Sequence, residues 1–281
     1  MMVSKYTYRN LKSMRKGTRL LFFFAFTSSC VFGQTDLKKI KEWKVRDVTM
    51  MAEDRLGDFF IVQKIGRIKK YDPNGKVLAS TSEKDVTLIE PWYHPSIFIY
   101  KRNKQQYVLY GRNFENREGF VVEPSIAIEP FLACPTHDNK LWIFDKADNS
   151  LKKVNRYTNE VIQEFEIEPK HIANQAEFTY LREYLNLVFL LDKNSGILIL
   201  NHLGLVINKI EIKDLKSFYF YGEEIYYLEN DKLKFLNLVT EKEHEVNLPT
   251  GTQQAIITDE RIIILNNSSK VALYTYSLEA Q

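Results

Sequence analysis

A short apolar segment recurs six times along the chain, and its spacing constrains the fold more than any other feature. Each copy is a run of four β-favouring residues followed at once by a polar turn. The first residues of successive copies are 38, 44, 47, 37 and 37 positions apart. Four-stranded propeller blades repeat about every 40–45 residues. The copies occupy residues 59–62, 97–100, 141–144, 188–191, 225–228 and 262–265.

This spacing predicts an all-β chain folded as a six-bladed β-propeller with four-stranded antiparallel blades. In the first blade we expect an inner strand over 48–52, a second strand over 59–62, a third over 67–71 and an outer strand over 76–80. The sequence Asp72-Pro73-Asn74-Gly75 is typical of a reverse turn between the last two strands. The continuous apolar runs predict second strands that are buried on both faces.

The two ends of the chain predict how the ring closes. After the sixth run, residues 270–276 form one further strand and the chain then ends without an outer strand. A spare strand pattern over 37–45 precedes the first blade. We therefore expect this N-terminal segment to complete the last blade and to remove its open edge.

Residues 1–33 are expected to be a secretory signal, which leaves 34–281 as the propeller domain. The segment contains six basic residues and no acid, then an apolar stretch over 20–26 and small residues before Gly33. A membrane-spanning helix needs about 20 apolar residues, and this stretch is shorter. The expected cleavage follows Gly33. We therefore expect an exported protein.

Cys30 offers an alternative route of processing. The sequence Thr27-Ser28-Ser29-Cys30 loosely resembles a bacterial lipobox, in which the cysteine is acylated and becomes the mature N-terminus. The position of Thr27 departs from that pattern, which prefers Leu. Lipidation at Cys30 would anchor the protein to a membrane, whereas cleavage after Gly33 would release it.

Composition after removal of the signal argues against a nucleic-acid partner. The chain has 39 basic and 36 acidic residues, and loss of the six basic residues of the signal leaves 33 bases against 36 acids. Lys and Glu are interspersed, whereas nucleic-acid binding calls for a basic patch. Only Cys134 remains among the cysteines, in an apolar inner strand, so no intramolecular disulfide can form and we expect an inert buried thiol.

The sequence of residues 66–78 resembles the repeat of NHL-type and TolB-like six-bladed propellers. It reads Gly-Arg-Ile-Lys-Lys-Tyr-Asp-Pro-Asn-Gly-Lys-Val-Leu. The resemblance covers about residues 37–281 and rests on turn chemistry and strand pattern. Together with the expected signal, it makes the chain similar to uncharacterised secreted or lipid-anchored propellers of Gram-negative envelopes. The resemblance implies a location in the periplasm or at the periphery of the outer membrane. It also implies a binding or scaffold role and assigns no functional residue.

No catalytic signature is evident. The repeated Trp motifs of quinone-dependent dehydrogenases are absent, since the chain has three Trp in unlike contexts. A serine hydrolase domain with a Gly-x-Ser-x-Gly elbow is also absent. His94 and His137 precede adjacent second strands, where we expect turn histidines rather than a zinc pair. We therefore expect no cofactor, and a non-catalytic role is favoured over an enzymatic one.

A metal-dependent hydrolase or lyase, similar to propeller lactonases, remains the alternative. Such a site needs several oxygen ligands from different blades converging on one cation. The candidates near strand ends are Glu129, Asp145, Asp192 and Asn194, although acidic turn residues more often cap hairpins.

Two irregular insertions are the candidates for partner binding, because extra loop length on a rigid scaffold is where binding sites are most often found. One spans 110–122 and the other 169–183. The residues proposed for partner contact are Arg112, Arg117, Tyr180 and Arg182. The favoured function is a non-catalytic binding or scaffold protein of the cell envelope. Its partner would be an envelope protein or a small ligand, bound by a monomer or within a hetero-complex.

Overall fold

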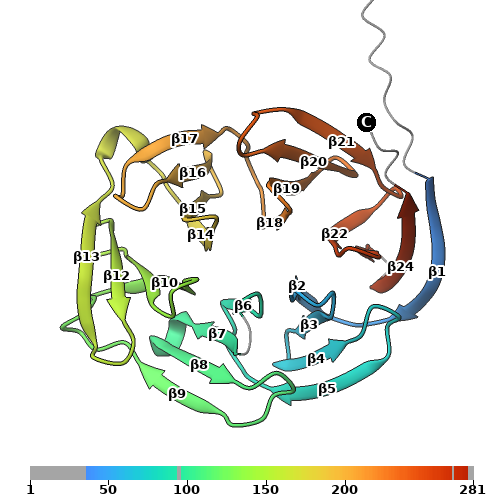
Figure 1. The fold of residues 1–281 in the computed structure, drawn as a ribbon, viewed down its shortest axis with the longest axis horizontal. Coiled ribbons are helices and arrows are strands. Elements are labelled where there is room, and N and C mark those ends of the chain that lie inside the picture. Colours follow the sequence, from blue (N-terminus) through green and yellow to red (C-terminus); the bar gives the residue numbers. More distant parts are fainter. Residues whose placement is uncertain (1–35, 94–95, 268, 278–281) are drawn as a thin grey trace, which may run out of the picture. The chain divides into compact units, whose positions relative to one another are not determined.

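The chain folds as a six-bladed β-propeller, as the spacing of the apolar runs predicts. The computed structural model describes residues 36–93, 96–267 and 269–277. In this part of the chain, strands form six four-stranded antiparallel sheets arranged around a common axis (Figure 1). The expected signal over 1–33 and the lipidation candidate Cys30 lie outside the described residues.

Five blades consist of consecutive strands, and the sixth combines the two ends of the chain. The first three blades, each from its inner to its outer strand, are β2 (Val48–Glu53), β3 (Phe59–Gln63), β4 (Arg67–Tyr71) and β5 (Val77–Ser82); β6 (Leu88–Glu90), β7 (Ile97–Lys101), β8 (Gln106–Tyr110) and β9 (Glu118–Val121); and β10 (Pro130–Pro135), β11 (Leu141–Asp145), β12 (Ser150–Asn155) and β13 (Glu160–Glu166). The other three are β14 (Phe178–Tyr184), β15 (Leu187–Asp192), β16 (Gly196–Leu200) and β17 (Val206–Ile210); β18 (Phe218–Tyr221), β19 (Glu224–Glu229), β20 (Lys232–Asn237) and β21 (Glu243–Asn247); and β22 (Thr252–Ile257), β23 (Ile262–Asn266), β24 (Lys270–Ser277) and β1 (Asp36–Lys44).

Helical structure is limited to two 3-10 segments in the described residues, η1 (Arg102–Lys104) and η2 (Pro169–His171). Across the same ranges, no helix has the length and apolar character needed to cross a membrane.

The six apolar runs form the second strands and carry the core. Every residue of β7 and β11 is buried, as are the first four residues of β3 and β23. The fifth blade departs from the expectation of burial on both faces, since Tyr227 and Leu228 of β19 are only half-buried. Outer strands are much more exposed, and all four residues of β9 are solvent-accessible. The hydrophobic effect therefore acts mainly between neighbouring blades.

The predicted turn at 72–75 is confirmed by its hydrogen bonds. Asp72 Oδ1 accepts from the backbone nitrogens of Asn74 at 3.0 Å and Lys76 at 2.8 Å. Gly75 N donates to Asp72 O at 2.9 Å, and Gly75 has a φ of 71°. A glycine fits this left-handed conformation without the steric cost that a Cβ atom brings.

The expected closure of the ring is also confirmed. β1 pairs antiparallel with β24 and forms the outer strand of the last blade. The segment also contacts the first blade, because the Trp43 ring lies 5.6 Å from the Tyr71 ring and Lys41 Nζ donates to Gly75 O at 2.9 Å. The N-terminal strand thus holds the last blade and the first blade together.

The contact between Gly75 and Trp43 yields a prediction with a matched control. A Cβ atom on Gly75 would lie 3.0 Å from Leu273 Cδ1 and 3.1 Å from a Trp43 ring carbon, whereas at Gly222, φ 58°, it would meet nothing within 4 Å. Both alanine variants should lose roughly 1 kcal/mol to the left-handed backbone. G75A should lose about 1–3 kcal/mol more from crowding at the closure.

Urea unfolding of the two variants measures this difference. Equal losses for G75A and G222A would show that the turn of the first blade does not support the closure.

Candidate functional site

The first pair of predicted metal candidates holds a turn together. Asp145 ends β11 and accepts from the backbone nitrogens of Ile128 at 2.8 Å and Glu129 at 2.9 Å, and from Lys152 Nζ at 2.8 Å. Burial by itself would raise the pKa of Asp145, but the Lys152 ammonium and the backbone donors outweigh it and hold that pKa below its usual value. The carboxylate therefore ties the segment entering the third blade to its second strand.

The second pair does the same in the next blade. Asp192 ends β15, and its Oδ1 accepts from Glu177 N at 2.8 Å and Asn194 N at 3.1 Å. The Asn194 side chain donates to Gln175 O at 2.5 Å. The structure thus brings Glu129 to Asp145 and Asn194 to Asp192, each pair within its own blade. Over 36–93, 96–267 and 269–277, no group of three or more His, Cys, Asp or Glu side chains is placed to hold a metal ion.

A groove of about 370 Å³ lies between the turns that precede the outer strands of the second and third blades. One wall is the 111–116 segment, which includes the predicted partner residue Arg112, and the other is formed by Arg156 and Tyr157. Tyr107 and Phe120 also line it. This volume lies within the usual range of sites for small ligands or inserted side chains, roughly 300–1,000 Å³.

Aromatic rings form a column that ends in this groove. The Tyr107 ring stacks on Phe98, with centroids 5.6 Å apart, and on Phe120, at 5.0 Å. Phe98 is buried, whereas Phe120 is 37 % exposed. On the opposite wall Tyr157 is 75 % exposed, and its hydroxyl lies 2.7 Å from Arg156 Nη2. The groove therefore presents apolar ring surface beside a guanidinium.

Arg117, the other residue predicted in this insertion, serves as an anchor. Its Nε donates to Glu83 Oε1 at 2.6 Å, and the Tyr110 hydroxyl donates to the same oxygen at 2.7 Å. Lys101 Nζ pairs with the other oxygen of this carboxylate. Burial would raise the pKa of Glu83, but Arg117, Lys101 and Tyr110 lower it to about 2. One buried carboxylate thus fixes the segment that carries Arg112.

The centre of the ring holds a second group of charges, which the sequence did not predict. Arg182 on β14 and Glu90 at the end of β6 form a buried ion pair between the fourth and second blades, although Arg182 Nε is not aligned as a hydrogen-bond donor. Glu53, at the end of β2, is also buried, and its Oε2 has no hydrogen-bond partner in the structure. Burial raises the pKa of Glu53 to about 8, against the opposing effect of the Arg182 charge.

The expected surface location of Tyr180 and Arg182 is wrong. Both lie on the inner strand β14, which begins at Phe178 and takes up the last six positions of the interval predicted to be an irregular insertion. Arg182 is 4 % exposed, and Tyr180 packs against the buried Phe218 ring at 5.2 Å. The sequence did not indicate a buried strand here, because it contains an arginine that pairs with an acid from another blade.

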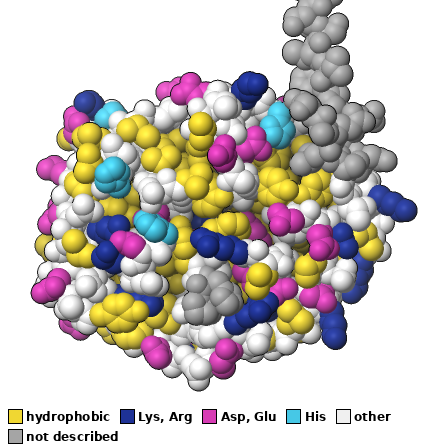
Figure 2. Space-filling view, viewed as in Figure 1, with side chains coloured by type: hydrophobic (Ala, Val, Ile, Leu, Met, Phe, Trp, Pro, Cys, Tyr) yellow, Lys and Arg dark blue, Asp and Glu magenta, His cyan; other side chains and the backbone are white. Residues whose placement is uncertain are grey.

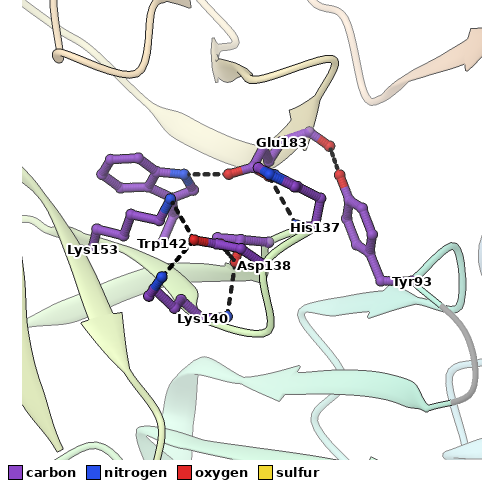
Figure 3. A network of polar contacts seen from close by, with 8 residues as sticks. Tyr93, His137, Asp138, Lys140, Trp142, Lys153 and Glu183 are labelled. Carbon is purple, nitrogen blue, oxygen red and sulfur yellow. Dashed lines mark hydrogen bonds and ion pairs between the residues drawn. The ribbon is translucent and has the colours of Figure 1, made fainter.

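Glu183, next to Arg182 in the chain, joins the second, third and fourth blades (Figure 3). Its buried Oε1 lies 2.7 Å from His137 Nδ1 and accepts from His137 N at 2.9 Å, while Oε2 accepts from Trp142 Nε1 at 2.7 Å. The Tyr93 hydroxyl donates to Glu183 O at 2.7 Å. His137 is a turn histidine, as predicted, but a buried carboxylate orients its ring. Its imidazole is half-exposed.

One sequence signal could have revealed the central acids. Glu53, Glu90 and Glu183 precede the apolar runs of their blades by six, seven and five positions, respectively. In each of these three blades an acid therefore stands close to the end of the inner strand. Pattern alone did not indicate that these acids face the ring centre or the next blade.

Comparisons with known proteins show the fold and do not assign a family. No protein-family model and no curated protein matches the chain. The WD40 domain of Pan2 from Neurospora crassa superposes with a TM-score of 0.58 at 7 % identity, covering 88 % of this chain and 97 % of that one. An extracellular domain of the putative hybrid two component system BT4673 from B. thetaiotaomicron gives 0.54 at 12 % identity, covering 83 % of this chain and 34 % of that chain.

BamB from Moraxella catarrhalis gives a TM-score of 0.49 at 8 % identity and covers 85 % of this chain and all of that one. At 7 % and 12 % identity, the Pan2 and BT4673 domains establish only the propeller fold, because propellers support many unrelated activities.

The buried Glu53 carboxyl, whose Oε2 has no hydrogen-bond partner, predicts an unusual dependence of stability on pH. Because its pKa in the folded protein, about 8, lies above the usual 4.5, the folded state retains a proton that the unfolded state loses between these values. The free energy of unfolding should therefore fall as pH rises from 4.5 to 8, by on the order of a few kcal/mol. E53Q cannot ionise and should be the more stable protein at pH 9.

Urea unfolding of wild type and E53Q across this pH range tests the prediction. E83Q is the control, because Glu83 stays ionised across this range and loses its stabilising contribution only as pH falls from 4.5 toward about 2, so the difference between E83Q and wild type should stay constant. If the free energies of unfolding of wild type and E53Q change with pH in parallel, the raised pKa of Glu53 is contradicted.

Proposed function

We propose that this chain is a non-catalytic binding or scaffold protein of the bacterial cell envelope and that the groove between the second and third blades contacts its partner. The observation that carries the proposal is the groove itself, in which Phe120, Tyr157 and two arginines surround a cavity of about 370 Å³. Tyr and Arg are the residue types that dominate the energetics of protein interfaces. Arg112 is held in position by a segment anchored on a buried carboxylate.

The surrounding surface is suited to a specific contact rather than to a general electrostatic one. Figure 2 shows acidic and basic side chains interspersed on the viewed face, with hydrophobic side chains between them. Within the groove, Arg112 and Arg156 are accompanied by Glu115 and Glu118. Binding there would depend on shape and on a few anchors.

No specific observation favours the alternative of a metal-dependent hydrolase or lyase. The oxygens of Asp145 and Asp192 accept hydrogen bonds from backbone amides of their own blades. A ligand role would require these carboxylates to give up bonds that hold the turns. We therefore base the proposed function on the groove.

Photo-crosslinking tests the proposed contact surface. A photoreactive amino acid placed at Tyr157 should yield one defined crosslinked partner in the cells that produce the protein. The matched control is Val239, which is 68 % exposed, close to the 75 % of Tyr157, and also precedes an outer strand. R112A and R156A should each reduce the product by several-fold, in line with about 1–2 kcal/mol for an interface arginine.

Equal products from positions 157 and 239, or none from either, would contradict the assignment of the groove. Blot intensity and mass spectrometry of the crosslinked species provide the measurement.

Export is a separate proposal with its own measurement. Basic residues followed by an apolar stretch within 1–33 support it. Mass spectrometry of the protein from its native cells should find a mature N-terminus, either Gln34 or an acylated Cys30. Recovery of the chain with residues 1–33 intact in the cytoplasmic fraction would contradict export.

A further inference from the structure

The turn after β2 carries an arginine whose charge lies against aromatic rings. The guanidinium carbon of Arg55 is 5.5 Å from the centroid of the Trp92 ring and 5.6 Å from that of the Tyr93 ring. Arg55 is exposed and belongs to the first blade, whereas both rings follow β6 in the second blade. In the parts of the chain that the structure describes, no carboxylate lies within ion-pair distance of Arg55. The Arg55 guanidinium is therefore held by cation–π contacts with these two rings.

The two rings are held by contacts that do not involve Arg55. Trp92 N donates to Glu90 Oε1 at 3.0 Å, and the Trp92 ring packs edge-on against Tyr184 at 5.9 Å. The Tyr93 hydroxyl donates to Glu183 O at 2.7 Å (Figure 3). Removal of the Arg55 side chain would leave this pair of rings in place, so the platform is preorganised.

The charges around the rings favour a cation. Glu90 and Glu183 are buried around this end of the ring centre, where Arg182 is the buried guanidinium that pairs with Glu90. Their influence reaches the platform, because burial first and then the negative charges of Glu183 and Glu90 raise the pKa of Tyr93. The charge of Arg55, in turn, opposes the rise that burial causes in the pKa of Glu90.

We propose that Trp92 and Tyr93 form a binding site for a guanidinium group, filled in the isolated chain by Arg55 and available to an arginine side chain of a protein partner when Arg55 moves aside. A planar guanidinium stacks on aromatic faces and is less strongly hydrated than an ammonium group, which favours arginine over lysine as the visiting side chain. Arg55 is exposed and lacks an ion pair, so its displacement breaks only its two cation–π contacts. The proposal does not depend on the groove between the second and third blades.

Fluorine NMR of protein labelled with 5-fluorotryptophan tests the site directly. The chain has three Trp, so W92F identifies the resonance of Trp92, and those of Trp43 and Trp142 report on the fold. The probe is methylguanidinium, and its neutral isostere methylurea is the control ligand. The variants are R55A, which empties the platform, and R67A, which removes an exposed arginine of β4 in the same blade.

In R55A, methylguanidinium should shift the Trp92 resonance with a Kd on the order of 1–10 mM. Wild type and R67A should bind at least about tenfold more weakly, because Arg55 still covers the rings. Methylurea should leave the resonance unchanged in every protein. R55A/W92A should give no saturation-transfer signal from the probe methyl group.

The proposal is overturned if methylguanidinium leaves the Trp92 resonance of R55A unmoved while the other two resonances show a native fold. An equal response to methylurea would exclude recognition of the charge. Equal affinity in wild type and R55A would exclude occupation of the site by Arg55.

Discussion

Antiparallel pairing between β1 and β24 is the constraint on which the rest of the structure depends. It joins residues from opposite ends of the described chain, with Leu37 opposite Tyr276 and Trp43 opposite Val271. A propeller blade exposes its apolar faces unless a neighbour covers each of them, so an open ring would leave two blades partly uncovered. Trp43 extends the closure into the first blade through its contacts with Phe59 and Tyr71. The geometry of every inner strand follows from this closed ring.

Closure also explains how charges can persist at the centre. Arg182 and Glu90 come from blades that are not neighbours, and the Tyr219 hydroxyl of the fifth blade donates to Met51 O of the first at 3.1 Å. Each of these contacts joins inner strands of blades that are not neighbours. A buried ion pair contributes little net stability, since desolvation offsets the attraction, but removing one partner is costly. The central charges therefore make the ring sensitive to protonation, above all at Glu53, whose buried Oε2 has no hydrogen-bond partner.

The two candidate binding surfaces are built in different ways. The groove is formed by two turns near the outer strands, and the 111–116 turn is anchored by the contact between Arg117 and the buried Glu83. The platform of Trp92 and Tyr93 lies near the ring centre and is fixed by Glu90 and the backbone of Glu183. Both place aromatic rings on rigid supports, which lowers the entropic cost of binding. Both also rely on a buried acid, Glu83 after the outer strand β5 and Glu90 at the end of the inner strand β6.

The sequence by itself determined the blade number, the second strands, the turn at 72–75 and the strand that closes the ring. These features are encoded locally, because apolar runs and turn residues act over a few positions. Only the tertiary structure decided what the polar residues do. It assigned Asp145 and Asp192 to turns, moved Tyr180 and Arg182 from an expected surface insertion to an inner strand, and brought Arg55 onto the rings of the next blade. Each of these outcomes depends on residues from separate segments meeting in space, and pairing between blades has no periodic signal in the chain.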